Sequence, residues 1–130
     1  MLKKVLVLVL GFLFIVSAAF AYDLPKVYKR AYTADQPAST LITPTSGYKV
    51  VISNVAISAG ASGAGSVYIF DSADTATTAI TPTVVLANNG FYQQTFNPPM
   101  PASSVGSVIK YTSGSGAVGS IWIEYTEQQN

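Results

Sequence analysis

The sequence predicts an all-β protein, an antiparallel β-sandwich of seven or eight strands with jelly-roll connectivity. Short runs rich in β-branched and aromatic residues recur along the chain, and no helical period appears after residue 21. Turn signals rich in Gly, Pro, Asn and Ser separate these runs roughly every ten residues, the spacing typical of a sandwich. Long crossings at 35–47 and 97–105 favour a jelly roll over a meander.

The first 21 residues predict a hydrophobic signal helix that directs secretion. Lys3 and Lys4 form a short basic start, Val5–Val16 is apolar, and Ala19 and Ala21 supply the small residues of a cleavage site. We expect cleavage after Ala21. The alternative is an uncleaved membrane anchor. The apolar stretch is at the short limit of the length that a membrane span requires. The protein is therefore expected outside the cell or on its surface, or in the periplasm of a Gram-negative cell.

The chain beyond the signal segment is expected to hold an N-terminal arm or edge strand (22–37) and one β-sandwich domain (38–130). The run 48–58 is long, rich in β-branched residues and apolar on both faces near Val50, which predicts the central strand. Pro82 cannot donate a backbone hydrogen bond, so the segment Thr77–Leu86 that contains it is expected to be a bulge or an edge.

Three reversals of the chain are expected to be hairpins. The run 67–70 is expected to return beside the central strand. Residues 88–90 carry the Asn-Gly signal of a tight hairpin turn. In the last two strands the apolar faces meet when Ile109 pairs with Ile121. That pairing needs an odd loop, most simply Gly114–Gly116, with a glycine at positive φ.

The segment Lys26–Thr33 predicts an edge strand or an extended arm. Tyr28, Arg30 and Tyr32 share one of its sides in the extended conformation. Its three basic residues are a common protection against edge-to-edge pairing. If the segment detaches, it could complete the sheet of a neighbouring molecule. It is therefore a candidate assembly arm.

Charge and composition exclude several classes of function. The chain has seven basic and six acidic residues, and removal of Lys3 and Lys4 leaves five against six. So neutral a chain has no electrostatic footprint for nucleic acid or for an anionic membrane. It has no Cys, so no disulfide framework supports it, and small secreted domains of this kind often gain stability by assembling. Further copies of the chain or other surface proteins are the expected partners.

The reactive side chains needed for catalysis are largely missing. Without His or Cys, the chain lacks Ser-His-Asp and Cys-His nucleophile systems and zinc sites built on imidazole or thiolate. No pattern brings two of its six carboxylates together, so we expect no enzyme and no cofactor. Asp71 and Asp74 could hold Ca²⁺ through oxygen. The alternative is that both cap their own turn through the backbone.

Trp122 is the candidate ligand-binding residue. It is expected on the face of Lys110 and Glu124, opposite Ile121 and Ile123. An exposed Trp122 could stack on a sugar, with Glu124 and Lys110 bonding to its hydroxyls. A subunit contact and ordinary packing under a second layer are the alternatives.

The order of turns and strands carries a resemblance to known proteins. The segments that carry it are Leu41–Val50, Val67–Asp71, Asn89-Gly90-Phe91, Phe96-Asn97-Pro98-Pro99 and Ile121–Tyr125. Together they resemble small single jelly-roll modules of phage virion and bacterial surface proteins, over about residues 38–126. The resemblance implies a structural or attachment role. We therefore expect a secreted, non-enzymatic subunit of an extracellular filament, coat or surface layer, with a carbohydrate-binding or adhesion module as the alternative.

Overall fold

The computed structural model describes residues 24–72 and 79–129 and contains eight β-strands. The predicted signal segment at 1–21 lies outside these residues. The strands, in chain order, are β1 (Lys26–Tyr32), β2 (Ser39–Ile42), β3 (Tyr48–Ala59), β4 (Gly65–Asp71), β5 (Val84–Leu86), β6 (Phe91–Pro101), β7 (Ile109–Ser113) and β8 (Gly119–Gln129).

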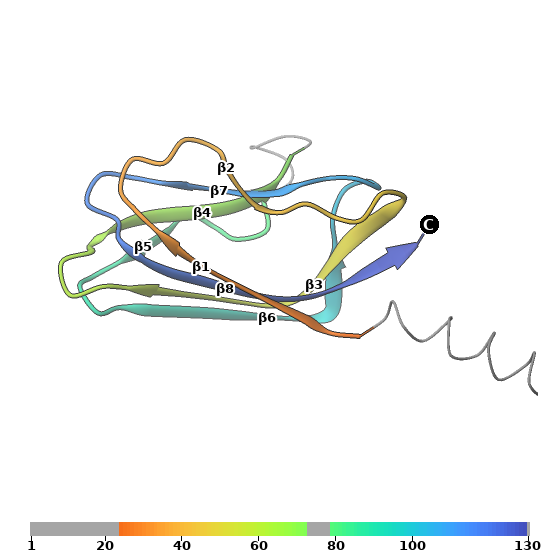
Figure 1. Cartoon of the computed structure of the whole chain (residues 1–130). Helices are drawn as coiled ribbons and strands as arrows, with labels where there is room; N and C mark the ends of the chain where they lie inside the picture. The colour runs from red at the N-terminus through yellow and green to blue at the C-terminus, as the bar shows by residue number, and fades with distance from the viewer. Residues whose placement is uncertain (1–23, 73–78, 130) are drawn as a thin grey trace, which may run out of the picture.

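The strands form two four-stranded antiparallel sheets that pack face to face (Figure 1). The first sheet has the order β1-β8-β3-β6 and the second has the order β2-β7-β4-β5. The expected all-β sandwich is therefore confirmed. None of the described residues belongs to a helix long and apolar enough to cross a membrane.

Most turns carry the chain from one sheet to the other. Among the described strands, only β4 and β5 are successive in sequence and paired in the same sheet. The expected hairpins at 88–90 and 114–116 are therefore wrong, and β4 does not return beside β3. Gly116 does have the expected positive φ of 79°. A turn signal shows only that the chain reverses its direction. At 88–90 and at 114–116 the reversal leads from one sheet to the other.

Ile109 and Ile121 illustrate the difference between a hairpin and a crossing. Ile109 pairs with Asp71 on β4, whereas Ile121 pairs with Ile57 on β3 and Arg30 on β1. Both isoleucines are completely buried in the one core between the sheets. The apolar faces of the two segments thus meet across the sandwich and not within a sheet.

The strand β3 is central to the first sheet, as the sequence predicts, and pairs with β8 on one side and β6 on the other. Its register shifts between Ile52 and Asn54 against both neighbours. The extra residue, Ser53, forms a bulge that reverses which face each later side chain occupies. Strict alternation predicts Ile52 and Asn54 on one face, but the bulge keeps Ile52 and Val55 in the core and turns Asn54 outward.

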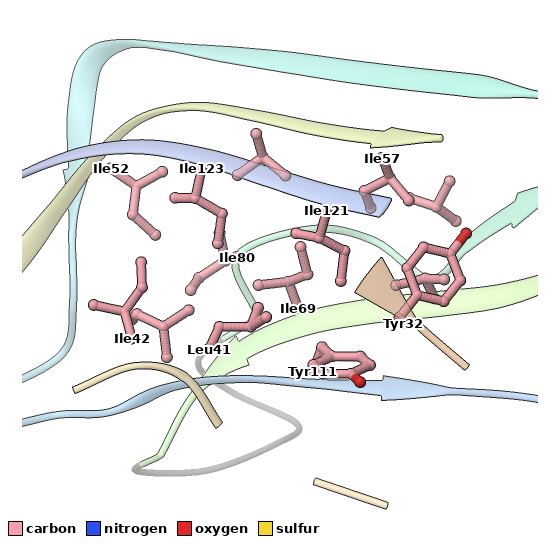
Figure 2. Packing of buried hydrophobic residues seen from close by; sticks show 14 of the residues in the cluster. Tyr32, Leu41, Ile42, Ile52, Ile57, Ile69, Ile80, Tyr111, Ile121 and Ile123 are labelled. Carbon is pink, nitrogen blue, oxygen red and sulfur yellow. The ribbon is translucent and has the colours of Figure 1, made fainter. Parts of the chain in front are cut away.

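Aliphatic and aromatic side chains from both sheets fill the core (Figure 2). Each buried Ile or Val contributes roughly 1.5–3 kcal/mol relative to an exposed side chain. This burial supports the fold without any disulfide, since the chain has no cysteine. The largest fully buried apolar residues are Tyr32, Tyr111, Ile52, Ile57, Ile69, Ile109, Ile121 and Ile123.

Candidate functional site

The outward side of the first sheet, which we call the outer face, is the candidate functional surface. The bulge at Ser53 turns Asn54 and Ala56 to the outward side of the sheet, and the register aligns Ala56 with Trp122 on β8 and with Gln93 on β6. Because paired residues share a face of the sheet, Trp122 and Gln93 point outward as well. The outer face also carries Val27, Lys29, Ser58, Phe91 and Glu124.

An open depression of about 260 Å³ lies on the outer face. Ala56 is its small central residue, and Trp122 and Phe91 belong to its wall. A smaller hollow, which shares these three residues, continues past Ser58 and Ser120. The residues that line the larger depression are Val27, Asn54, Ala56, Phe91, Gln93, Trp122 and Glu124.

Three large apolar side chains of this surface are exposed to solvent. Trp122 is 45% exposed, Phe91 59% and Val27 70%. Apolar side chains gathered in this way commonly mark a surface that contacts another molecule. The Lys29 ammonium lies 4.9 Å from the centre of the Trp122 ring, within the range of a cation–π contact.

The structure brings together two of the three residues predicted to bind a ligand. Trp122 and Glu124 are both on the outer face, opposite the buried Ile121 and Ile123, as expected. Lys110 is not with them, because β7 belongs to the second sheet. The expectation that Lys110 shares a face with Trp122 rested on a hairpin between β7 and β8, which does not form. The cation beside Trp122 is Lys29, which sequence reasoning missed because no local signal shows that β1 pairs with β8.

The predicted assembly arm is an edge strand of its own molecule. Tyr28, Arg30 and Tyr32 share the side of β1 that faces the core, and Tyr32 is 2% exposed. The Tyr32 hydroxyl donates a hydrogen bond of 3.1 Å to the carbonyl oxygen of Ser58. Arg30 donates a hydrogen bond to the carbonyl oxygen of Thr40 in the opposite sheet. Contacts with both sheets therefore hold β1 in place.

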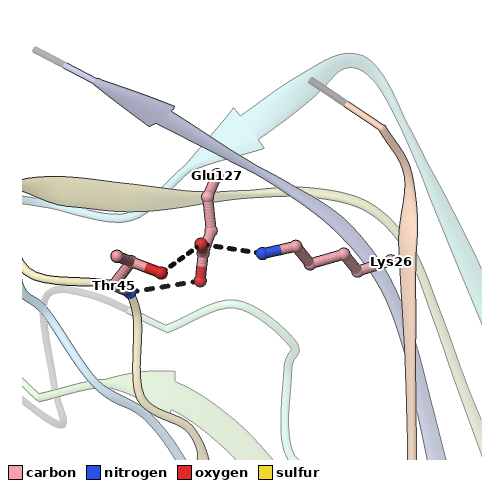
Figure 3. A network of polar contacts seen from close by, with 3 residues as sticks. All are labelled: Lys26, Thr45 and Glu127. Carbon is pink, nitrogen blue, oxygen red and sulfur yellow. Dashed lines mark hydrogen bonds and ion pairs between the residues drawn. The ribbon is translucent and has the colours of Figure 1, made fainter. Parts of the chain in front are cut away.

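Glu127 anchors the open end of β1, a role that the sequence did not reveal (Figure 3). Its Oε2 accepts hydrogen bonds from Lys26 Nζ at 2.8 Å and from the Thr45 hydroxyl at 2.7 Å, and its Oε1 accepts the Thr45 N–H at 3.2 Å. Burial raises the pKa of the Glu127 carboxyl, but these hydrogen bonds outweigh burial, so its pKa lies below the ordinary value. The only signal in the sequence was that Glu127, an acidic residue, falls at a position of β8 where the alternation of the strand points the side chain toward the core.

The predicted calcium site is described only in part. Asp71 is buried, and its Oδ2 accepts the N–H of Ser103 at 2.8 Å, so it supports the loop before β7. Asp74 lies outside the described residues. Within 24–72 and 79–129, no group of three or more His, Cys, Asp or Glu side chains is placed to hold a metal ion. Calcium binding remains a prediction.

The carboxylates of the last strand do not form a catalytic pair. Glu124 points to the outer face, whereas Glu127 is buried toward the inner side and occupied by Lys26 and Thr45. Two carboxylates that share a substrate would have to face the same space. Around its depression the outer face therefore offers apolar contact, amide groups and the charges of Lys29 and Glu124, which suit binding.

Comparisons with known proteins give fold likenesses only. No protein-family model and no curated protein matches the chain. A solved structure of Bacillus endospore appendages, described as a novel family of disulfide-linked pili, is 16% identical over 82% of this chain and 88% of that chain, with a TM-score of 0.48. The VLP of the extra small virus of the giant freshwater prawn Macrobrachium rosenbergii is 16% identical over 83% and 80%, with a TM-score of 0.44. We assign no function to this chain from either likeness.

Proposed function

We propose that this chain is an exported, non-enzymatic structural subunit that assembles with its own copies into an extracellular filament, coat or surface layer. We infer that its strand order, β1-β8-β3-β6 over β2-β7-β4-β5, is that of a jelly roll. Export rests on the basic, apolar and small-residue pattern of the first 21 residues.

The free edge of β6 is the observation that carries this proposal. The strand is eleven residues long and has no charged side chain, and no described strand pairs with its outer side. Unpaired N–H and C=O groups along such an edge are a template for a strand from another chain. Pro98, Pro99 and Pro101 interrupt the template at the far end, which leaves Phe91–Phe96 as the accessible part.

The other three edges are protected or short. At the opposite side of the first sheet, β1 carries Lys26, Lys29 and Arg30. In the second sheet, the edge strands β2 and β5 have four and three residues. Short strands and basic side chains are usual defences against unwanted pairing. The absence of such defences from Phe91–Phe96 supports a role for that edge in assembly.

The mass of the protein in solution tests the proposal. The full chain is expressed for export and purified as the cell processes it, and its weight-average mass is measured by analytical ultracentrifugation over a wide concentration range. We expect the mass to rise with concentration. We expect Gln94→Lys, which adds a charge on the inner side of the β6 edge and away from the outer face, to reduce that rise.

Val118→Lys is the matched control, because it adds the same charge at an exposed position in the loop before β8. It should associate like the unmodified protein. Circular dichroism establishes that both variants fold. A species that stays monomeric up to millimolar concentration, with no filaments in electron micrographs, overturns the proposal. Turnover of a substrate that depends on two carboxylates does so as well.

A further inference from the structure

We propose that the outer face of the first sheet is a self-complementary interface, covered by the same face of a second copy related by a two-fold axis. This inference rests on the proposed assembly and adds to it a second contact, distinct from the β6 edge. Two-fold contacts of this kind require one surface patch to match itself in shape and charge. The residues around the depression meet both requirements.

The apolar residues of the outer face lie along a diagonal across the sheet. Val27 on β1 is level with Glu124 on β8. Trp122 lies two residues before Glu124 on β8. Phe91 on β6 is level with Ser120, two residues before Trp122. A two-fold axis that runs in the plane of the interface along this diagonal brings each of these side chains against its own copy. Trp and other aromatic residues at the centre of an interface commonly supply most of its binding energy.

The two charges beside the depression stand on opposite sides of that diagonal. Lys29 pairs with Trp122 across β1 and β8, and Glu124 pairs with Val27 across the same two strands. Rotation about the diagonal therefore places Lys29 of each copy opposite Glu124 of the other, so that no like charges meet. This charge pattern favours a second copy over an unrelated partner.

Small and uncharged residues complete the surface. Ala56 lies on the floor of the depression and Ser58 on that of the adjoining hollow, which leaves room for the aromatic rings of an opposing copy. Asn54 and Gln93 supply amide groups at the rim, where the Gln93 amide already donates to Asn54 Oδ1 at 3.4 Å. A polar rim around an apolar centre is the usual composition of a specific interface.

Charge reversal tests the pairing of Lys29 with Glu124. Lys29→Glu makes the charges beside the depression both negative, and Glu124→Lys makes them both positive. We expect each variant alone to dimerise about tenfold more weakly than the unmodified protein. We expect an equimolar mixture of the two to recover the affinity, because only the mixed pair is complementary. Lys110→Glu is the matched control, since it makes the same change on the second sheet and should leave the affinity unchanged.

The single tryptophan provides an independent readout, because Trp122 is the only Trp in the chain. Its emission should shift to shorter wavelength as the protein concentration rises, since dimerisation removes its ring from water. We expect Lys29→Glu to move this shift to higher concentration. Gln94→Lys should leave the shift in place, because the β6 edge is a different contact and Gln94, which pairs with the buried Val55, lies on the opposite side of the sheet from Trp122.

The outcomes separate this interface from the proposed function. Assembly that Gln94→Lys weakens, while the charge variants and the Trp122 emission stay unchanged, overturns the two-fold interface and leaves the proposed function standing. The absence of any association overturns both. Binding to a glycan array that is lost in Trp122→Ala, with no concentration-dependent shift of Trp122 emission, assigns the outer face to carbohydrate and overturns the interface. A concentration-dependent shift together with recovery in the mixture supports it.

Discussion

Lys26 Nζ lies 2.8 Å from Glu127 Oε2, and this ion pair joins the beginning of the first described strand to the end of the last. The carboxylate is buried, whereas the lysine side chain is 43% exposed. Thr45, in the turn between β2 and β3, donates both of its polar hydrogens to the same carboxylate. Three segments that are distant in sequence therefore meet at one buried charge.

Removal of this carboxylate should destabilise the fold. We expect Glu127→Ala to lower the free energy of unfolding by about 1–3 kcal/mol, because Lys26 and Thr45 lose a charged hydrogen-bond acceptor. Urea denaturation measures the change. Glu124→Ala is the control, since it removes an exposed carboxylate from the same strand. Equal unfolding midpoints for the two variants would show that the network contributes nothing.

The same carboxylate should make stability depend on pH in acid. The pKa of Glu127 is lower in the folded protein than its ordinary value of 4.5, because the hydrogen bonds from Lys26 and Thr45 outweigh the effect of burial, which raises it. The unfolded chain thus binds the proton more readily. The ionised Glu127 carboxylate therefore stabilises the fold above pH 4.5, and this stabilisation is lost as the pH falls through the folded-state pKa.

The thermal unfolding temperature, measured from pH 7 down to pH 2, tests this dependence. The difference between the unmodified protein and Glu127→Gln should be largest near neutral pH and should shrink in acid. Lys26 limits the stability of the same ion pair at alkaline pH. The hydrogen bond that Lys26 donates to Glu127 raises the Lys26 pKa above its ordinary value of 10.5, so the Lys26 contribution to stability is lost as the pH rises through that raised pKa. A difference that stays constant across the acid range contradicts the assignment.

Tyr32 should couple β1 to β3 through its hydroxyl. The hydroxyl donates to the Ser58 carbonyl oxygen, and its ring meets that of Tyr111 edge-on with centroids 6.4 Å apart. We expect Tyr32→Phe to cost about 0.5–1.5 kcal/mol, since it removes the hydrogen bond and keeps the ring. Tyr32→Ala should cost about 3–5 kcal/mol, because it also leaves a cavity. Thermal denaturation measures both, and faster amide exchange confined to β1 would show that the strand is loosened first.

The sequence predicted local structure well. The long β-branched run is the central strand, Pro82 does precede an edge strand, and Gly116 has the positive φ expected of a turn glycine. Alternation also identified Trp122 as outward and Ile121 as buried. These properties depend on backbone preferences and on the period of a strand, both of which are local.

Long-range pairing was not predictable in the same way. A reversal at 88–90 or 114–116 suits a hairpin and a crossing equally, so the sequence misplaced Lys110 beside Trp122 and left Lys29 unnoticed. No signal in the sequence predicts the bulge at Ser53, although the bulge determines that Asn54 and Ala56 face outward. Glu127 was hidden for a similar reason, since its partners lie 101 and 82 residues away.

Gly119, at the start of β8, should tolerate no side chain. A Cβ at this position would lie 1.8 Å from the Ser58 carbonyl oxygen and 2.7 Å from the Tyr32 hydroxyl. Those two atoms form the hydrogen bond that links β1 to β3 across β8. Alanine there must push the strands apart or break that bond.

We expect Gly119→Ala to lower the free energy of unfolding by about 1–3 kcal/mol, the usual cost of inserting an atom into a closely packed position. Gly60→Ala is the control, because its Cβ would meet only the Val118 carbonyl oxygen, at an ordinary contact distance of 3.5 Å. Urea denaturation compares the two variants. If Gly119→Ala unfolds at the same urea concentration as Gly60→Ala, the Ser58 carbonyl oxygen and the Tyr32 hydroxyl do not lie as close to Gly119 as this packing requires. In that case Tyr32→Phe should cost nothing either, because both variants test the same contact.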